Sequence, residues 1–483
     1  MGTRIGTIVI SVFMVHALQA QDTWDLQRCV DYALKHNISV RQADLQARFS
    51  ELQFRQNKAA QFPNLNFNAS GGYRLGRSEN PTTGVLEDNN FLNLGLQLQS
   101  QVTLFNWFSL KHTREASRLS WEADKQQIEK AQNDIALNVA TAYLQVLLSR
   151  EQAKLANLQV EQTRTLLRDT RARVDAGLLP ELNAAELEAQ LARDSSAWVT
   201  AEGTVQQLLL QMKALLNLDA ATAFDLAVPP VDIIPVEPLA ELEPGKVYAS
   251  ALANLPQQKV NNLRLQSAQK SVAAAKGNLY PSISAFGGLF SNAISFRRPI
   301  YNDIITGYSS AAGLRANVGG TFYPVEIPVV QEGSTVVGYF RPGPIGTQLN
   351  NNFGQSIGIG ISVPIFNGKQ ARTGWERAKL QVKQWELTYE QDSMTLKQDI
   401  YNAHNDAVVA LQKFNANKKS VETSQKAYDF AERRFAVNLL STYELVTSQN
   451  NLQRAKIDLL YTQYDYLFKM KLLEFYKGQG IKL

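Results

Sequence analysis

The sequence predicts a mixed α/β membrane protein that contains the same unit twice. The stretch at residues 173–191 recurs at 434–452, an offset of 261 positions, with Arg, Leu-Leu and Leu at matching places. In both copies, short segments of alternating apolar and polar residues precede a long segment that is nearly free of glycine and proline. Each copy is therefore expected to hold two strands followed by one long helical hairpin.

The long segments are predicted to be coiled-coil-like helices. Residues 111–216 contain two glycines and one proline, and residues 371–477 contain one glycine and no proline. Apolar residues also recur every seven positions, as at Val139, Val146 and Ala153 and again at Ile400 and Ala407. At about 1.5 Å per residue, a helix over 107–176 would be roughly 100 Å long, several times a bilayer core, so these rods are expected to lie in water.

A glycine and a proline explain how each rod folds back. Gly177 is expected to end the ascending helix in a left-handed conformation, and Pro180 to open the descending helix at its first turn. In the second copy Asn438 takes the place of the glycine, and Ser441 or Thr442 is expected to be the N-cap. The hairpins are predicted at about 107–218 and 368–478.

The alternating segments, at about 62–104 and 280–365, are predicted to be membrane strands. Their polar positions carry uncharged Asn, Gln, Ser and Thr, which suits a water-filled lumen, and a tilted strand of about thirteen residues crosses a bilayer core. Aromatic residues stand at the ends nearest the rods, where an interfacial girdle would lie: Phe62, Phe105, Tyr280 and Phe366. For an exported chain without a membrane helix, a closed barrel is the remaining spanning structure.

Export is expected because residues 1–20 have the features of a signal peptide. Arg4 precedes an apolar core at Ile8–Val15, and the small residue Ala20 marks a cleavage site. No later segment approaches 18 uninterrupted apolar residues, so no membrane helix is expected in the mature chain.

Four strands are too few to close a barrel around a lumen, so the chain is expected to be an oligomer. Two chains would supply eight strands and three would supply twelve, and this arithmetic does not decide between them. The second copy carries about 43 additional residues between 282 and 354. These are expected to form the larger extracellular loop.

Composition favours neither an enzyme nor a nucleic-acid-binding protein. The net charge is +5 without a basic block, and the four histidines show no metal-ligand spacing. The sequence contains no H-E-x-x-H, G-x-S-x-G or Walker A motif, so no catalytic site, metal or cofactor is expected.

The order and spacing of these segments resemble the TolC-like outer-membrane efflux proteins. The resemblance runs from "CVDYALKHNISVRQADLQ" at residue 29 through both strand–rod units to "LEFYKG" at residue 473. It implies a homotrimer with a twelve-stranded barrel in the outer membrane of a Gram-negative bacterium, a periplasmic α-barrel and a small equatorial belt. The chain would then divide into a first repeat at 21–219, a belt linker at 220–246 and a second repeat at 247–483.

The resemblance also implies partners and contact residues. Such proteins are the exit ducts of tripartite efflux or type I secretion systems, and their hairpin tips meet a periplasmic adaptor that joins an inner-membrane pump of RND or ABC type. The corresponding tip residues here are Gly177, Leu178, Leu179, Pro180, Asn438, Leu439, Leu440 and Ser441. Candidates for a tunnel constriction near the tips are Asn183, Glu186, Glu444 and Thr447.

Two other functions remain possible from the residues. A periplasmic coiled-coil scaffold or adaptor without membrane insertion would account for the rods, although not for two pairs of membrane strands. A passive porin would account for the strands, although not for the rods. The sequence does not distinguish drug, metal, peptide or protein cargo.

Overall fold

The computed structural model describes residues 23–79, 86–88, 90–227, 238–437 and 439–478. The predicted signal peptide, Asn438 and residues 228–237 of the predicted linker lie outside these ranges. The chain divides into two compact units, with boundaries after Arg55, Thr113, Val272 and Glu376. The first unit holds most of the helical residues and the second holds the large sheet.

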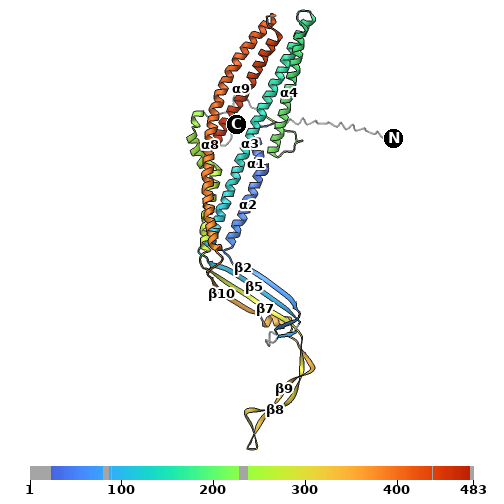
Figure 1. The fold of residues 1–483 in the computed structure, drawn as a ribbon, viewed down its shortest axis with the longest axis vertical. Coiled ribbons are helices and arrows are strands. Elements are labelled where there is room, and N and C mark those ends of the chain that lie inside the picture. Colours follow the sequence, from blue (N-terminus) through green and yellow to red (C-terminus); the bar gives the residue numbers. More distant parts are fainter. Residues whose placement is uncertain (1–22, 80–85, 89, 228–237, 438, 479–483) are drawn as a thin grey trace, which may run out of the picture. The chain divides into compact units, whose positions relative to one another are not determined.

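Two long helical hairpins dominate the first unit (Figure 1). Their ascending helices have 67 residues each and their descending helices 36 each, so the internal repeat appears as two hairpins of equal length. The four helices are α3 (Ser109–Asp175), α4 (Glu181–Leu216), α8 (Gln370–Ala436) and α9 (Thr442–Lys477). Within the described ranges, every helix lacks the length or the apolar content that crossing a membrane requires.

Shorter elements pack beside the hairpins. These are the helices α1 (Leu26–His36), α2 (Ile38–Ala59), α5 (Pro244–Asn254) and α6 (Pro256–Gly277), and a 3₁₀ turn at Leu239–Glu241 precedes α5. A short parallel pair, β1 (Thr23–Trp24) and β6 (Asp225–Leu226), lies in the same unit.

The apolar residues that recur every seven positions along the ascending helices are buried where other helices cover them. Val139, Val146 and Ala153 are buried in one apolar cluster with residues of α1, α4 and α9. Ile400 and Ala407 are buried in a second cluster with residues of α5 and α9. The heptad pattern therefore marks the packing surface of both ascending helices.

A buried carboxylate links three helices of the first unit. Asp124 on α3 has a side chain only 3% exposed and forms an ion pair with Arg264 on α6. Its other carboxylate oxygen accepts a hydrogen bond from the Ser50 hydroxyl on α2, and Arg264 also donates to the Ser120 hydroxyl (2.6 Å). A charge this deeply buried is tolerated only when such partners surround it.

An antiparallel four-stranded sheet forms the centre of the second unit, and each repeat contributes two of its strands. The strand order is β10–β7–β5–β2, so β10 and β2 are the sheet's edges. The bounds are β2 (Asn64–Arg74), β5 (Phe91–Phe105), β7 (Ser282–Ser295) and β10 (Gly354–Ser362). The four amphipathic strands expected from the sequence are thus present.

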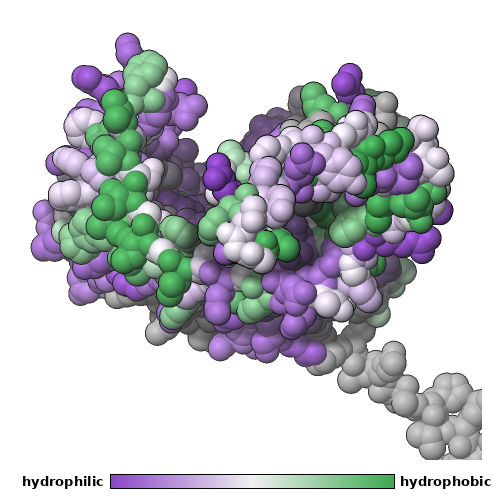
Figure 2. Space-filling view, turned by 90° about the horizontal axis from the view of Figure 1, so that it is seen from below, coloured by the Kyte–Doolittle hydropathy of each residue, from purple (hydrophilic) through white to green (hydrophobic). Residues whose placement is uncertain are grey.

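Exposed aliphatic side chains cover one face of β10. Ile357, Ile359 and Ile361 are 93%, 70% and 69% exposed. Apolar residues are exposed in contiguous patches over the surface seen in Figure 2. A surface of this kind needs an apolar environment or a partner.

The opposite face of β10 is less polar than the alternation predicts. Gly354 and Gly358 pair directly with Phe290 and Phe286 of β7. A Cβ atom at either glycine would lie 2.4 or 2.6 Å from the facing phenylalanine ring. These glycines therefore leave room for rings that lie over the neighbouring strand, and the aromatic side chains share the face predicted to be polar.

The additional residues of the second copy form regular structure where an extracellular loop was expected. They fold into a two-stranded antiparallel ribbon of β8 (Arg298–Val318) and β9 (Thr321–Phe340), followed by the short helix α7 (Ile345–Asn351). Gly319 and Gly320 turn the chain with φ values of +64° and +90°, which suit a tight hairpin. The segment is rich in β-branched and aromatic residues, and this explains why it forms strands. A shorter pair, β3 (Arg77–Glu79) and β4 (Leu86–Asp88), lies between β2 and β5.

Replacing Asp124 with Ala tests the buried carboxylate. The change leaves Arg264 and Ser50 without their partner, so we expect a loss of roughly 2–4 kcal/mol in stability, measured as a lower thermal unfolding midpoint by circular dichroism. Glu122→Ala is the matched control, because its ion pair with Arg118 is exposed and its loss should cost less than about 1 kcal/mol. Equal midpoints for the two variants would contradict this role for Asp124.

Candidate functional site

The first hairpin tip ends in a glycine that adopts a left-handed conformation. Gly177 has φ +73°, its N–H donates to the Val174 carbonyl (2.8 Å), and the Leu178 N–H donates to the Arg173 carbonyl (2.9 Å). This pair of bonds is the Schellman motif, which satisfies the last carbonyls of a helix. The interpretation of Gly177 as the helix terminator agrees with this geometry.

The second tip shows the same closure with a different start to the descending helix. The Leu439 N–H donates to the Arg434 carbonyl (2.9 Å). Ser441 is the N-cap of α9, and its hydroxyl accepts from the Glu444 N–H (3.2 Å) while Glu444 accepts from the Ser441 N–H (3.0 Å). This is a capping box, and the hydrogen bond from the backbone of Ser441 lowers the pKa of Glu444.

At the first tip, the descending helix α4 begins without a side-chain cap. Pro180 is the N-cap residue of α4 and makes no side-chain capping bond, and helix α4 begins at Glu181. The expectation that Pro180 stands in the first helical turn is therefore wrong by one position, because the helix begins one residue later than predicted. Across this turn, Arg171 of α3 donates to both Glu181 and Glu188 of α4 at 2.5 Å, and these ion pairs tie the two helices together.

Apolar side chains project into solvent at both tips. Leu178 is 69% exposed and Leu439 is 68% exposed, whereas Leu179 and Leu440 are half-buried. Leu182 and Tyr443, on the first turns of α4 and α9, are similarly exposed. Because Leu178 and Leu439 point into solvent and do not cover the hairpin ends, each tip presents an apolar patch.

A groove of about 410 Å³ lies between α4 and α9 close to the tips. Glu186 of α4 and Thr447 of α9, two of the predicted constriction residues, both line it. The other two behave differently: Asn183 is half-buried outside the lining, and the Glu444 carboxylate is engaged in the capping box. The structure thus brings Glu186 and Thr447 together and gives Glu444 a local structural contact.

A chain of polar side chains crosses the base of this groove. Thr163 Oγ1 of α3 donates to Asp194 Oδ2 of α4 (2.7 Å). Gln190 Nε2 of α4 donates to Asp194 Oδ1 (2.7 Å) and to Asn450 Oδ1 of α9 (3.2 Å). This chain links the two hairpins, and sequence reasoning did not find it because its members belong to three separate helices with no common spacing.

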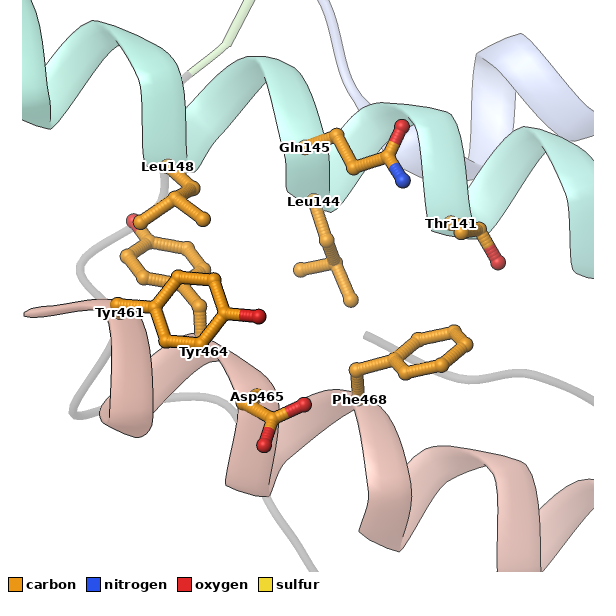
Figure 3. A pocket seen from close by; sticks show the side chains of 8 residues that line it. All are labelled: Thr141, Leu144, Gln145, Leu148, Tyr461, Tyr464, Asp465 and Phe468. Atoms are coloured by element: carbon orange, nitrogen blue, oxygen red, sulfur yellow. The ribbon is translucent and has the colours of Figure 1, made fainter. Parts of the chain in front are cut away.

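A smaller cavity of about 160 Å³ lies farther along the rods between α3 and α9 (Figure 3). Four lining side chains come from each helix, and most are aliphatic or aromatic; Asp465 is the only acidic one. The Tyr464 hydroxyl is buried without a hydrogen-bond partner, and burial raises its pKa to about 12. The cavity offers no pair of groups for acid–base or nucleophilic chemistry.

The described residues contain no group of three or more His, Cys, Asp or Glu side chains that could hold a metal ion. Cys29 is fully buried in α1, and burial raises the pKa of its thiol to about 12. The thiolate is therefore scarce at neutral pH, and this cysteine is a packing residue.

Comparison with known proteins identifies the family. The family model described as outer membrane efflux protein matches residues 29–218 and 346–478. The chain belongs to this family. It is 21% identical over 435 residues to the outer membrane efflux protein BepC of Brucella suis, covering 90% of this chain and 80% of BepC.

Solved structures show the same fold. The transmembrane-channel protein CusC superposes with a TM-score of 0.74 at 16% identity, covering 94% of this chain and 92% of the other. The outer membrane protein VceC of Vibrio cholerae gives 0.71 at 15% identity, covering 95% and 97%. The chain is thus an outer-membrane efflux protein, which supports the duct interpretation over a scaffold without membrane insertion.

Two glycine replacements test the tip geometry. Gly177→Ala places a Cβ on a left-handed residue and should destabilise the tip by about 1–2 kcal/mol. Gly203→Ala is the control, because it lies inside α4 with open space around it and should stabilise the helix by up to about 1 kcal/mol. Amide hydrogen exchange should become faster around residues 174–180 in the first variant and slower around 203 in the second. Unchanged exchange at the tip in Gly177→Ala would show that the turn tolerates a side chain.

Proposed function

We propose that three copies of this chain form the outer-membrane exit duct of a tripartite export system. An inner-membrane pump delivers cargo, a periplasmic adaptor joins the pump to the hairpin tips, and the duct carries the cargo outside. The observation that carries this proposal is that one chain combines two features. Its long helical hairpins end in exposed apolar tips, and its amphipathic four-stranded sheet has two unpaired edges.

The sheet supports assembly because its outer edges are unpaired. In the described sheet, β2 and β10 each pair with one strand only. Backbone groups at a sheet edge must find partners inside a bilayer, and four strands are too few to close on themselves. Three copies supply twelve strands, with β10 of one copy beside β2 of the next.

Side-chain contacts give the order of four neighbouring helices in the first unit and show which two are outermost. α2 stacks on α3 through Phe54 and Trp121, with ring centroids 5.7 Å apart. α6 contacts α3 through Arg264 and contacts α8 through a hydrogen bond from Asn261 to Asp392 (2.7 Å). The order α2–α3–α6–α8 therefore leaves α2 and α8 as the outermost helices of this part.

Both outermost helices carry exposed apolar stripes with coiled-coil spacing. On α2 the stripe consists of Ile38, Leu45, Phe49 and Leu52, and on α8 it consists of Leu380, Leu387, Met394 and Tyr401. Because the two stripes lie on different helices of one chain, the proposed contact is head-to-tail, the kind of contact from which a ring of copies is built.

Cross-linking tests the ring. In a Cys29→Ala background, Leu52→Cys combined with Leu387→Cys should give covalent products of two and three chains when a short bismaleimide is added to native membranes. Each single variant alone should give no such ladder, because it places only one partner of the contact. Cross-linked products of no more than two chains would indicate a dimer in place of the trimer. Monomers alone would overturn the proposed assembly.

A double substitution tests the tips. Leu178→Asp with Leu439→Asp puts charge into the apolar patches, so adaptor copurification should fall by at least about tenfold and dye export should be lost. The cross-linked trimer should persist, because the tips lie away from the stripes. Val199→Asp, at a mid-rod residue that is 66% exposed, is the control and should retain export. Normal export in the double variant would place adaptor docking elsewhere.

A further inference from the structure

The β8–β9 ribbon lies in a part of the chain that the family match does not cover. The match ends at residue 218 and resumes at 346, whereas the ribbon occupies Arg298–Val318 and Thr321–Phe340. Its two strands have 21 and 20 residues, longer than any strand of the four-stranded sheet. The family match therefore assigns no role to the residues of the ribbon.

The ribbon exposes more apolar surface than an isolated hairpin in water tolerates. Ile305 and Val330 are direct cross-strand partners and are 54% and 49% exposed. Tyr308 and Phe322 are 65% and 61% exposed. A two-stranded hairpin is marginally stable in water, and exposed apolar patches of this kind mark contact surfaces.

Hydrogen bonds attach the root of the ribbon to the sheet. Gln348 of α7 accepts from the Ile294 N–H and donates to the Ile294 carbonyl, both at 2.9 Å. Asn352 donates to the Asn292 carbonyl of β7 (2.8 Å), and the Phe296 and Phe340 rings meet at 5.8 Å. The root therefore stands where β7 ends and β10 begins, beside the edge strand that would meet the next copy.

The ribbon's charge and edges favour association through its faces. Between 298 and 340 there are two arginines and three acidic residues, a net charge of −1, so copies repel one another little. Pro324 and Pro328, four residues apart on β9, lack the N–H that a further strand would need. The prolines thus disfavour open-ended pairing along β9.

We propose that the β8–β9 ribbon binds its counterparts in the other copies, so that the ribbons pack through their apolar faces into an extracellular collar around the mouth of the duct. This inference rests on the proposed trimeric duct, which brings the ribbon roots together beside each β10 edge. The collar covers the apolar faces and extends the exit beyond the bilayer.

Single cysteines in the ribbon test the collar. In the Cys29→Ala background, Tyr308→Cys and Phe322→Cys are treated with a bismaleimide in native outer membranes, and each should give a product of two chains. The Leu52→Cys, Leu387→Cys pair, measured in parallel, reports the trimer independently. A trimer ladder without ribbon products overturns the collar and leaves the duct standing, whereas loss of the trimer ladder overturns the proposed assembly itself.

A second variant tests whether the apolar faces make the contact. Ile305→Asp with Val330→Asp, added to Tyr308→Cys, should reduce the ribbon product at least tenfold with an unchanged trimer ladder. Ser309→Asp, at an exposed polar position of β8, is the control and should retain most of the product. Unchanged cross-linking in the double Asp variant, or a ribbon product whose mass includes a different protein, would overturn the proposal.

Discussion

Unpaired backbone groups at the edges of β2 and β10 are the constraint on which the proposed assembly depends. A strand edge in a bilayer has no water to satisfy its N–H and C=O groups, so another strand must do so. Because one chain has too few strands to close the sheet, the edges require further copies. In the helical unit, α2 and α8 carry exposed apolar stripes that the proposed assembly would cover.

The two hairpins are equal in length but differ at their tips. Both use the same six-to-one backbone bond to end the ascending helix, at Leu178 and at Leu439. The second descending helix has a capping box at Ser441, whereas Pro180 offers no side-chain cap and the Arg171 ion pairs hold the first hairpin instead. Both arrangements leave a leucine exposed, so two different local structures give both tips the same apolar feature.

Buried polar groups set the relative positions of helices that apolar seams alone would leave free to slide. Apolar contacts are non-directional, whereas Asp124 and Asp194 accept bonds that only one alignment of their neighbours provides. Asp124 fixes α2, α3 and α6, and the chain through Asp194 and Gln190 fixes α3, α4 and α9. We infer that these contacts contribute alignment as well as stability.

The sequence by itself determined the features that depend on neighbouring residues. The rods follow from seven-residue periodicity, the tip from a glycine that can adopt positive φ, and the four strands from alternation; the sequence narrowed the N-cap of α9 to Ser441 or Thr442, and the structure places it at Ser441. The tertiary structure alone decided the features that join distant residues. The pairing of Gly358 with Phe286, the link from Gln190 to Asn450, and the folding of an expected loop into the β8–β9 ribbon depend on strand register and helix packing. Local spacing carries no information on such contacts, because their free energy exists only when separate segments are brought together.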